Sequence, residues 1–144
     1  VCCEDELVMI CAPSHRLPGM ASVTPHQIAA EPYVSRETGS GTREFADQYF
    51  RQSQVAPEDL NIIMELGSGE AIKGVVETGA GVSIMSRARV VKVLKLGVLV
   101  AIPLAPRLIR TLSFVHPKEK FRSKLLTTFV EFASDRMKRI AEPA

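Results

Sequence analysis

Two glycine-serine-glycine segments, at residues 39–41 and 67–69, constrain this chain more than any other feature. Each follows a short apolar run and precedes apolar residues at helical spacing. Strand–turn–helix units that alternate along a chain are typical of an α/β fold with a mainly parallel sheet. In such sheets the turns from strand to helix gather at the carboxyl edge, where ligands of open α/β proteins bind. The sequence therefore predicts that both turns lie at one ligand-binding edge.

The remaining elements follow from apolar runs and helical spacings. Thr24 and Pro25 have the residue types of an N-cap and a first helical position, which predicts a short helix there. Strands are expected at 7–12, 33–35, 60–66, 81–87, 97–104 and 108–115. Further helices are expected from residue 45, around 71–76, around 90–94 and over 123–140.

Each turn also offers anion-binding chemistry. A helix N-terminus leaves N–H groups unpaired and carries about half a positive charge. Ser40 or Thr42 is expected to cap the first helix, with Gly41 beside them, and Ser68 the second. An anion site is one interpretation of these turns, and a plain helix start is the other.

Several chemistries are disfavoured by the residues. Neither turn has the lysine of a phosphate-binding P-loop or the third glycine of a dinucleotide fingerprint. The sequence has no Gly-x-Ser-x-Gly and no His-Glu-x-x-His, so we expect no enzyme activity. Cys2, Cys3 and Cys11 lack metal-ligand spacing, and we expect neither a metal nor a cofactor.

The composition and net charge limit the classes of partner that this chain is expected to bind. The 144 residues are 46% hydrophobic and 24% charged, which is ordinary for a globular protein. No apolar run approaches the roughly 20 residues of a membrane span, so no membrane partner is expected. The net charge of +2 is too small to indicate nucleic-acid binding by this chain. Three cysteines without a disulfide pattern favour a cytoplasmic location.

Four stretches, taken in order, resemble the effector-binding domain of LysR-type transcriptional regulators. They are DELVMICAPSHRLPG, EPYVSRETGSGTREFADQYF, MELGSGEAIKGVVETGAGVSIMSR and GVLVAIPLAPRLIRTLSFVHPKEKFRSKLLTTFVEF. The resemblance covers nearly the whole chain, and the combination of the two turns is more specific than either alone. It implies a periplasmic-binding-protein-like (type 2) architecture, in which two α/β subdomains are joined by crossover strands.

The resemblance also implies a division of the chain. Residues 1–16 correspond to the first crossover strand, 17–106 to the second effector-binding subdomain, and 107–144 to the return strand and C-terminal helix. The winged helix-turn-helix and most of the first subdomain are expected to be missing, so that promoter DNA is bound only through the absent part. We expect the run at 7–12 and the apolar helix face at 125–133 to need a partner surface. The full-length protein is expected to be a homo-oligomer, a dimer or a tetramer, as its relatives are.

By the same resemblance, this is a ligand-sensing regulatory domain for a small anionic effector that modulates transcription. The expected effector-binding residues are Ser14, Ser35, Arg36, Gly67, Ser68 and Gly69. The planar guanidinium of Arg36 suits carboxylate, sulfate or phosphate, although pairing with Glu37 is an equally simple interpretation. Two alternatives remain: the solute-binding domain of a transporter, and an enzyme with the two-lobed layout of prephenate dehydratase.

Overall fold

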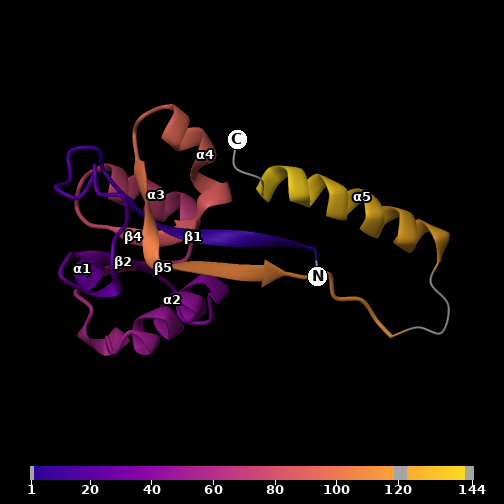
Figure 1. The fold of residues 1–144 in the computed structure, drawn as a ribbon, viewed down its shortest axis with the longest axis horizontal. Coiled ribbons are helices and arrows are strands. Elements are labelled where there is room, and N and C mark those ends of the chain that lie inside the picture. Colours follow the sequence, from indigo (N-terminus) through magenta and orange to yellow (C-terminus); the bar gives the residue numbers. More distant parts are fainter. Residues whose placement is uncertain (1, 119–122, 142–144) are drawn as a thin grey trace. The chain divides into compact units, whose positions relative to one another are not determined.

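The computed structural model describes residues 2–118 and 123–141. Its elements alternate between strands and helices, and Figure 1 shows their course. In chain order they are β1 (Cys3–Cys11), α1 (Pro25–Ala29), β2 (Tyr33–Arg36), α2 (Gly41–Gln52), the 3-10 helix η1 (Pro57–Asp59), β3 (Ile62–Leu66), α3 (Gly69–Glu77), β4 (Ser83–Ser86), α4 (Arg87–Lys95), β5 (Val100–Leu112) and α5 (Lys124–Ala141). The α/β class expected from the sequence is confirmed.

By internal contacts the chain divides into two units. The larger unit contains residues 6–108, and the smaller contains the described parts of 1–5 and 109–144. Strands β1 and β5 each belong to both units, because the division falls within them. The subdomain bounds expected from the family resemblance, at residues 16 and 106, stay a prediction.

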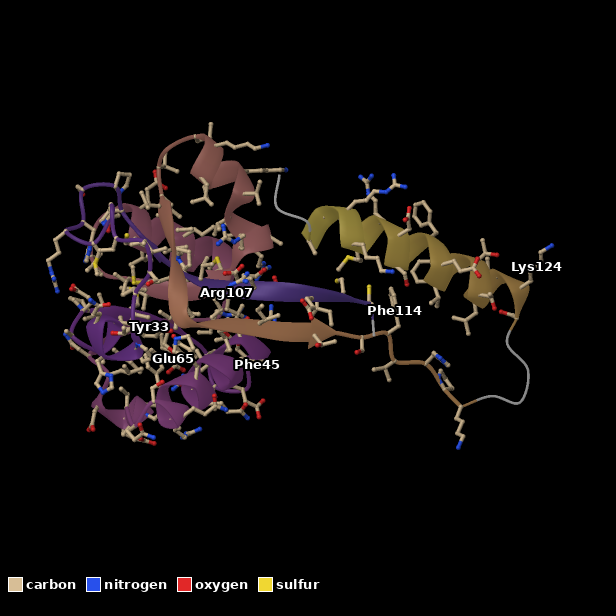
Figure 2. The ribbon with its side chains drawn as sticks, viewed as in Figure 1. Tyr33, Phe45, Glu65, Arg107, Phe114 and Lys124 are labelled. Carbon is tan, nitrogen blue, oxygen red and sulfur yellow. The ribbon has the colours of Figure 1, made fainter. Side chains whose placement is uncertain are left out.

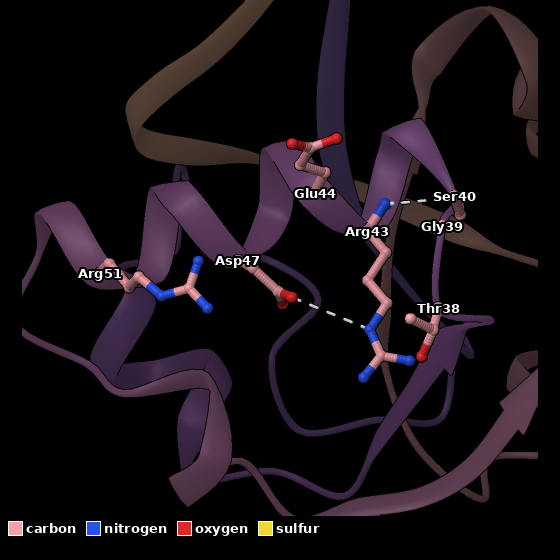
Figure 3. Close-up of a pocket in the computed structure, with 7 residues that line it drawn as sticks. All are labelled: Thr38, Gly39, Ser40, Arg43, Glu44, Asp47 and Arg51. Atoms are coloured by element: carbon pink, nitrogen blue, oxygen red, sulfur yellow. Dashed lines mark hydrogen bonds and ion pairs between the residues drawn. The ribbon is translucent and has the colours of Figure 1, made fainter.

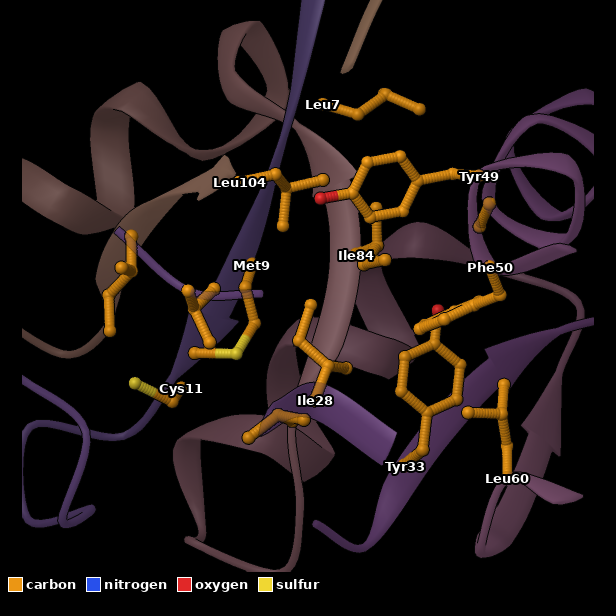
Figure 4. Close-up of a cluster of buried hydrophobic side chains, with 14 of the residues drawn as sticks. Leu7, Met9, Cys11, Ile28, Tyr33, Tyr49, Phe50, Leu60, Ile84 and Leu104 are labelled. Atoms are coloured by element: carbon orange, nitrogen blue, oxygen red, sulfur yellow. The ribbon is translucent and has the colours of Figure 1, made fainter. Parts of the chain in front are cut away.

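Strand β1 is buried on both faces, which explains its continuous apolar run. Because side chains alternate along a strand, Leu7, Met9 and Cys11 join one core and Val8 and Ile10 join another. The first core is packed by α1 and α2 (Figure 4), and the second by α3 and α4. The expectation that this run needs an additional partner surface is therefore wrong.

Strand pairing is mixed rather than wholly parallel. β2 and β3 pair in parallel, and a single parallel bridge joins Tyr33 of β2 to Val82 just before β4. β4 pairs with β1 in the antiparallel sense, in a sheet of order β4-β1-β5. The carboxyl ends of β2, β3 and β4 consequently point to the same side. The pairing of β1 with β4 starts there, because Leu7 is paired with Ser86.

The backbone just before β4 passes so close to Pro32 that only glycine fits at position 81. A Cβ atom on Gly81 would lie 2.6 Å from the backbone oxygen of Pro32, closer than any side chain tolerates. The same oxygen accepts a hydrogen bond from Val82 N at 2.8 Å. Glycine thus allows β4 to approach the start of β2.

One prediction about the strands is wrong. The two strands predicted at 97–104 and 108–115 are a single strand, β5, that runs through Pro103 and Pro106. Prolines usually break a strand because they lack the N–H donor. β5 lies at the edge of its sheet, where a missing donor costs little.

Helix α1 has the cap that the sequence predicts. Thr24 accepts from Gln27 N at 3.2 Å, and the Gln27 side chain accepts from Thr24 N at 2.8 Å, which forms a capping box. Pro25 occupies the first turn, where its missing N–H has no intrahelical role.

Helix α5 keeps its apolar face exposed. None of its residues is buried, and Leu125, Phe129 and Phe132 are 81%, 58% and 69% exposed. Ser123 caps its first turn by accepting from Leu126 N at 3.1 Å. The helix expected over 123–140 is confirmed in its position. Among the described residues, no helix is long and apolar enough to cross a membrane.

Candidate functional site

The ends of three strands and the starts of three helices meet at one edge of the larger unit. β2 ends at Arg36, which is in register with Leu66 at the end of β3. β4 ends at Ser86. Helices α2, α3 and α4 begin within a few residues of these ends. We call this edge, with its three helix N-termini, the carboxyl edge.

Serine side chains cap two of these helices. Ser40 accepts from Arg43 N at 3.4 Å, and Ser68 accepts from Ala71 N at 3.5 Å. Thr42 lies within α2 and is not its cap. Helix α4 differs, because its N-cap Ser86 makes no side-chain capping hydrogen bond. Its first turn contains Arg87 and no acidic residue, although acidic residues are favoured at a helix N-terminus.

Arg36 is held by its neighbour in sequence. Its Nε and Nη2 atoms donate to the two carboxylate oxygens of Glu37 at 2.8 and 3.0 Å. This pairing raises the pKa of Arg36 and lowers that of Glu37. The Arg36 side chain is 19% exposed. The structure therefore shows the pairing with Glu37 that was the alternative interpretation, and an anion here would have to compete with Glu37.

Arg43 ties α2 to both parallel strands. Its Nη1 atom donates to the backbone oxygen of Arg36 at 2.9 Å and to Glu65 at 2.7 Å. Its Nε atom lies 3.8 Å from Asp47, one turn further along the helix. Arg43 lies two residues after the first Gly-Ser-Gly turn, but no local sequence pattern indicates that Glu65 is its partner.

A pocket runs along α2 from the turn that precedes it to Arg51 (Figure 3). It has a volume of about 290 Å³. Its lining is Thr38, Gly39, Ser40, Arg43, Glu44, Asp47 and Arg51. Two arginines and two carboxylates balance one another, so the pocket has no preference for anions. The turn predicted to bind an anion thus contributes to a pocket of mixed charge.

Gly69 is buried beneath an arginine. A Cβ atom at this position would lie 2.9 Å from Nη1 of Arg89 on α4. Glycine therefore lets the Arg89 guanidinium lie over the first turn of α3. A substitution at Gly69 would require this flexible side chain to move.

A charged cluster missed by the sequence analysis lies where β1 passes the end of β4. Glu6 on β1 receives hydrogen bonds from Arg107 on β5, with Nη2–Oε2 and Nε–Oε1 distances of 2.7 and 3.3 Å. Arg87 approaches the same carboxylate with its Nη2 atom, 3.6 Å from Oε1. Figure 2 labels Arg107 on β5. The hydrogen bonds from Arg107, followed by the charge of Arg87, lower the pKa of Glu6. We call Glu6, Arg87 and Arg107 the Glu6 cluster.

The predicted effector residues are not all brought together. Ser35, Arg36 and residues 67–69 lie at the carboxyl edge, although Ser35 is buried and its hydroxyl donates to Arg36 O at 3.1 Å. Ser14 lies beyond the opposite end of β1, near Gly79, which precedes β4. The structure therefore places Ser14 at the other edge of the sheet, apart from the remaining candidates.

The family follows from comparison with known proteins. The family model described as the LysR substrate binding domain matches residues 1–138. The chain belongs to this family.

The curated relatives of this LysR domain are transcriptional regulators. The HTH-type transcriptional regulator YeiE of Escherichia coli strain K12 is 44% identical over 131 residues, which are 90% of this chain and 43% of YeiE. A probable RuBisCO transcriptional regulator of Phaeodactylum tricornutum is 32% identical over 138 residues, 95% of this chain and 44% of that protein. The chain thus spans less than half the length of these relatives.

Solved structures show the same LysR architecture. The regulatory domain of Synechocystis PCC6803 CcmR, in complex with 2-PG, aligns with a TM-score of 0.77 at 25% identity, over 95% of this chain and 65% of that one. The effector-binding domain of QuiR, in complex with shikimate, aligns with a TM-score of 0.70 at 21% identity, over 94% and 62%. These matches support a ligand-sensing regulatory domain and speak against the transporter alternative.

Proposed function

We propose that this LysR domain binds a small anionic effector at the carboxyl edge and that binding modulates the DNA affinity of the protein that contains it. The observation that carries the proposal is the convergence of three helix N-termini at the ends of β2, β3 and β4. Their N–H groups and partial positive charges favour an anion. CcmR and QuiR, which share this architecture, were solved with 2-phosphoglycolate (2-PG) and shikimate, and both of these ligands are anions.

The proposed contacts are Arg36 and the turn at Gly67, Ser68 and Gly69, with Ser35 supporting the end of β2. Ser68 caps α3 through its side-chain oxygen, so its hydroxyl proton remains available to an effector. Arg36 is committed to Glu37, and an effector would take over part of that pairing. Promoter DNA and homo-oligomer contacts belong, in this proposal, to the protein as a whole.

The test is calorimetric titration of the protein with 2-phosphoglycolate and with shikimate. We expect Arg36→Ala to weaken binding of the effective ligand by about 10- to 150-fold, because a hydrogen bond to a charged group contributes roughly 1.5–3 kcal/mol. Ser68→Ala is expected to weaken it less, because the backbone donors of the turn remain. Lys95→Ala at the C-terminal end of α4, away from this edge, is the charge-matched control.

Two results would overturn the proposal. In the first, the Arg36→Ala and Ser68→Ala variants both fold correctly and bind the effector as tightly as wild type does. The other is an effector that binds with equal affinity in wild type and variants and leaves the protein's affinity for its promoter unaltered.

A further inference from the structure

Arg87 is the least satisfied cation of the Glu6 cluster. Its Nε atom is buried and has no hydrogen-bond partner in the part of the chain that the structure describes. The one ion pair it forms within the described residues, with 3.6 Å between its Nη2 atom and Oε1 of Glu6, is long for a charge-assisted hydrogen bond. A buried donor without an acceptor is costly, and such groups in native proteins require an explanation.

Arg107 explains why Glu6 does not satisfy Arg87. Arg107 already occupies both oxygens of the Glu6 carboxylate, at 2.7 and 3.3 Å. Two guanidinium groups therefore share one carboxylate, which leaves the cluster with an excess of one positive charge. Arg87 also stands in the first turn of α4, where the helix dipole adds further positive potential and no acidic side chain offsets it.

Arg87 lies where its positive charge can reach a ligand at the carboxyl edge. It directly follows the last residue of β4, so it lies at the carboxyl edge with the end of β4. The Arg87 side chain is 35% exposed, which leaves its outer nitrogens accessible to a small molecule. Arg36, by contrast, is already neutralised in bidentate geometry by Glu37.

We propose that Arg87 is an oxyanion-binding residue of this edge, whose guanidinium exchanges Glu6 for a bound sulfate-, phosphate- or carboxylate-type group. This inference rests on the proposed function, because it adds a residue and a ligand chemistry to the same site. Glu6 keeps Arg107 as its partner when Arg87 turns to the ligand.

Inorganic sulfate is the probe, because it carries the oxyanion chemistry without the shape of any effector. The chain as it stands is titrated with sodium sulfate at constant ionic strength, by calorimetry or by amide chemical shifts. All three residues of the cluster lie in the larger unit, so this chain contains the whole site.

Arg87→Gln is expected to weaken sulfate binding at least about 10-fold, the factor that corresponds to one lost charge-assisted hydrogen bond. Arg87→Lys keeps the charge but not the planar fork, and is expected to give an intermediate affinity. Lys95→Gln is the matched control, with the same change of charge on the same helix about 12 Å away. It is expected to bind sulfate as wild type does.

Glu6→Gln separates a binding role from a structural one. Removing the competing carboxylate is expected to strengthen sulfate binding by at least about threefold. A purely structural brace would leave sulfate affinity unchanged in this variant. The inference is overturned if wild type does not bind sulfate, if Arg87→Gln binds it as wild type does while unfolding cooperatively, or if Glu6→Gln binds it no more tightly.

These outcomes are distinct from those that test the effector site. Sulfate binding that depends on Arg87, in a protein that ignores 2-phosphoglycolate and shikimate, supports the inference and counts against those two effectors. Effector binding that depends on Arg36 but not on Arg87 supports the proposed function and overturns the inference.

Discussion

Arg43 on α2 and Glu65 on β3 are 22 positions apart in the sequence, yet their Nη1 and Oε2 atoms lie 2.7 Å apart. The same Nη1 atom donates to the backbone oxygen of Arg36 at 2.9 Å. One side chain thus fastens the first turn of α2 to the ends of both parallel strands. The carboxyl edge depends on this fastening for its geometry.

Replacing Arg43 by glutamine is expected to lower the free energy of unfolding by about 1 kcal/mol, because it removes a hydrogen bond to the backbone and a partly exposed ion pair. Urea denaturation with a two-state fit measures the change. Arg51→Gln, an exposed arginine on the same helix, is expected to change stability by less than about 0.5 kcal/mol. Equal losses in the two variants would show that Arg43 does not fasten the helix.

Replacing Tyr49 by phenylalanine is expected to stabilise the protein. The Tyr49 hydroxyl is buried in the core shown in Figure 4 and has no hydrogen-bond partner among the described residues. Removing an unsatisfied buried hydroxyl is expected to raise the free energy of unfolding by about 1–2 kcal/mol. Tyr33→Phe is the matched control with the opposite sign, since the Tyr33 hydroxyl is hydrogen-bonded to the backbone of Ile84. A loss of stability in Tyr49→Phe would contradict the structure.

Stability is expected to fall in alkaline solution. Burial raises the pKa of Tyr49 from 10.0 to about 12 and that of Cys11 from 9.0 to about 11, and it raises the pKa of Tyr33 further. Each group ionises in the unfolded chain at a pH where the folded protein keeps it neutral. Its contribution is fully present below the unfolded pKa and is lost as pH rises towards the folded pKa.

The free energy of unfolding is therefore expected to decline from about pH 9 upwards. Urea denaturation at a series of pH values measures this slope. Tyr49→Phe is expected to flatten the part between the unfolded and folded pKa values of Tyr49. A flat profile in wild type up to about pH 11 would be inconsistent with these buried groups.

The apolar face of α5 is expected to drive self-association of this chain. Leu125, Phe129 and Phe132 are all more than half exposed, and exposed apolar patches favour association. The double variant Phe129→Ser/Phe132→Ser is expected to sediment as a smaller species than wild type at the same concentration. A wild-type chain that stays monomeric at high concentration and binds no apolar dye would argue against this.

This chain alone is expected not to bind promoter DNA selectively. Its net charge is +2, and phosphate contacts from several basic residues dominate the affinity of DNA-binding proteins. Gel-shift titration of the promoter against a scrambled sequence is the measurement. Sequence-selective retardation by this chain would mean that it contains a DNA-reading surface of its own.

Local chemistry was enough to predict most of the elements and their ends. The Thr24 cap, a hydroxyl cap on each of α2 and α3, and the buried strand at 7–12 depend on residues within a few positions of one another, and all three are found in the structure. The Arg36–Glu37 pair is local in the same sense, and the sequence already offered it as an alternative. Such features can be predicted because their physical causes lie within one turn or one strand.

Features that join distant segments depended on the tertiary structure. Two strands were expected, at 97–104 and 108–115, and only the edge position of β5 shows why a single strand tolerates Pro103 and Pro106. Ser14 and Arg36 lie at opposite edges because β1 runs antiparallel to β4, a direction that no local pattern encodes. The Glu6 cluster joins residues 6, 87 and 107, and their charges interact only because three chain segments meet at the end of β4. Electrostatic contact requires separations of a few ångströms, and for distant residues it is the packing of the whole unit that creates those separations.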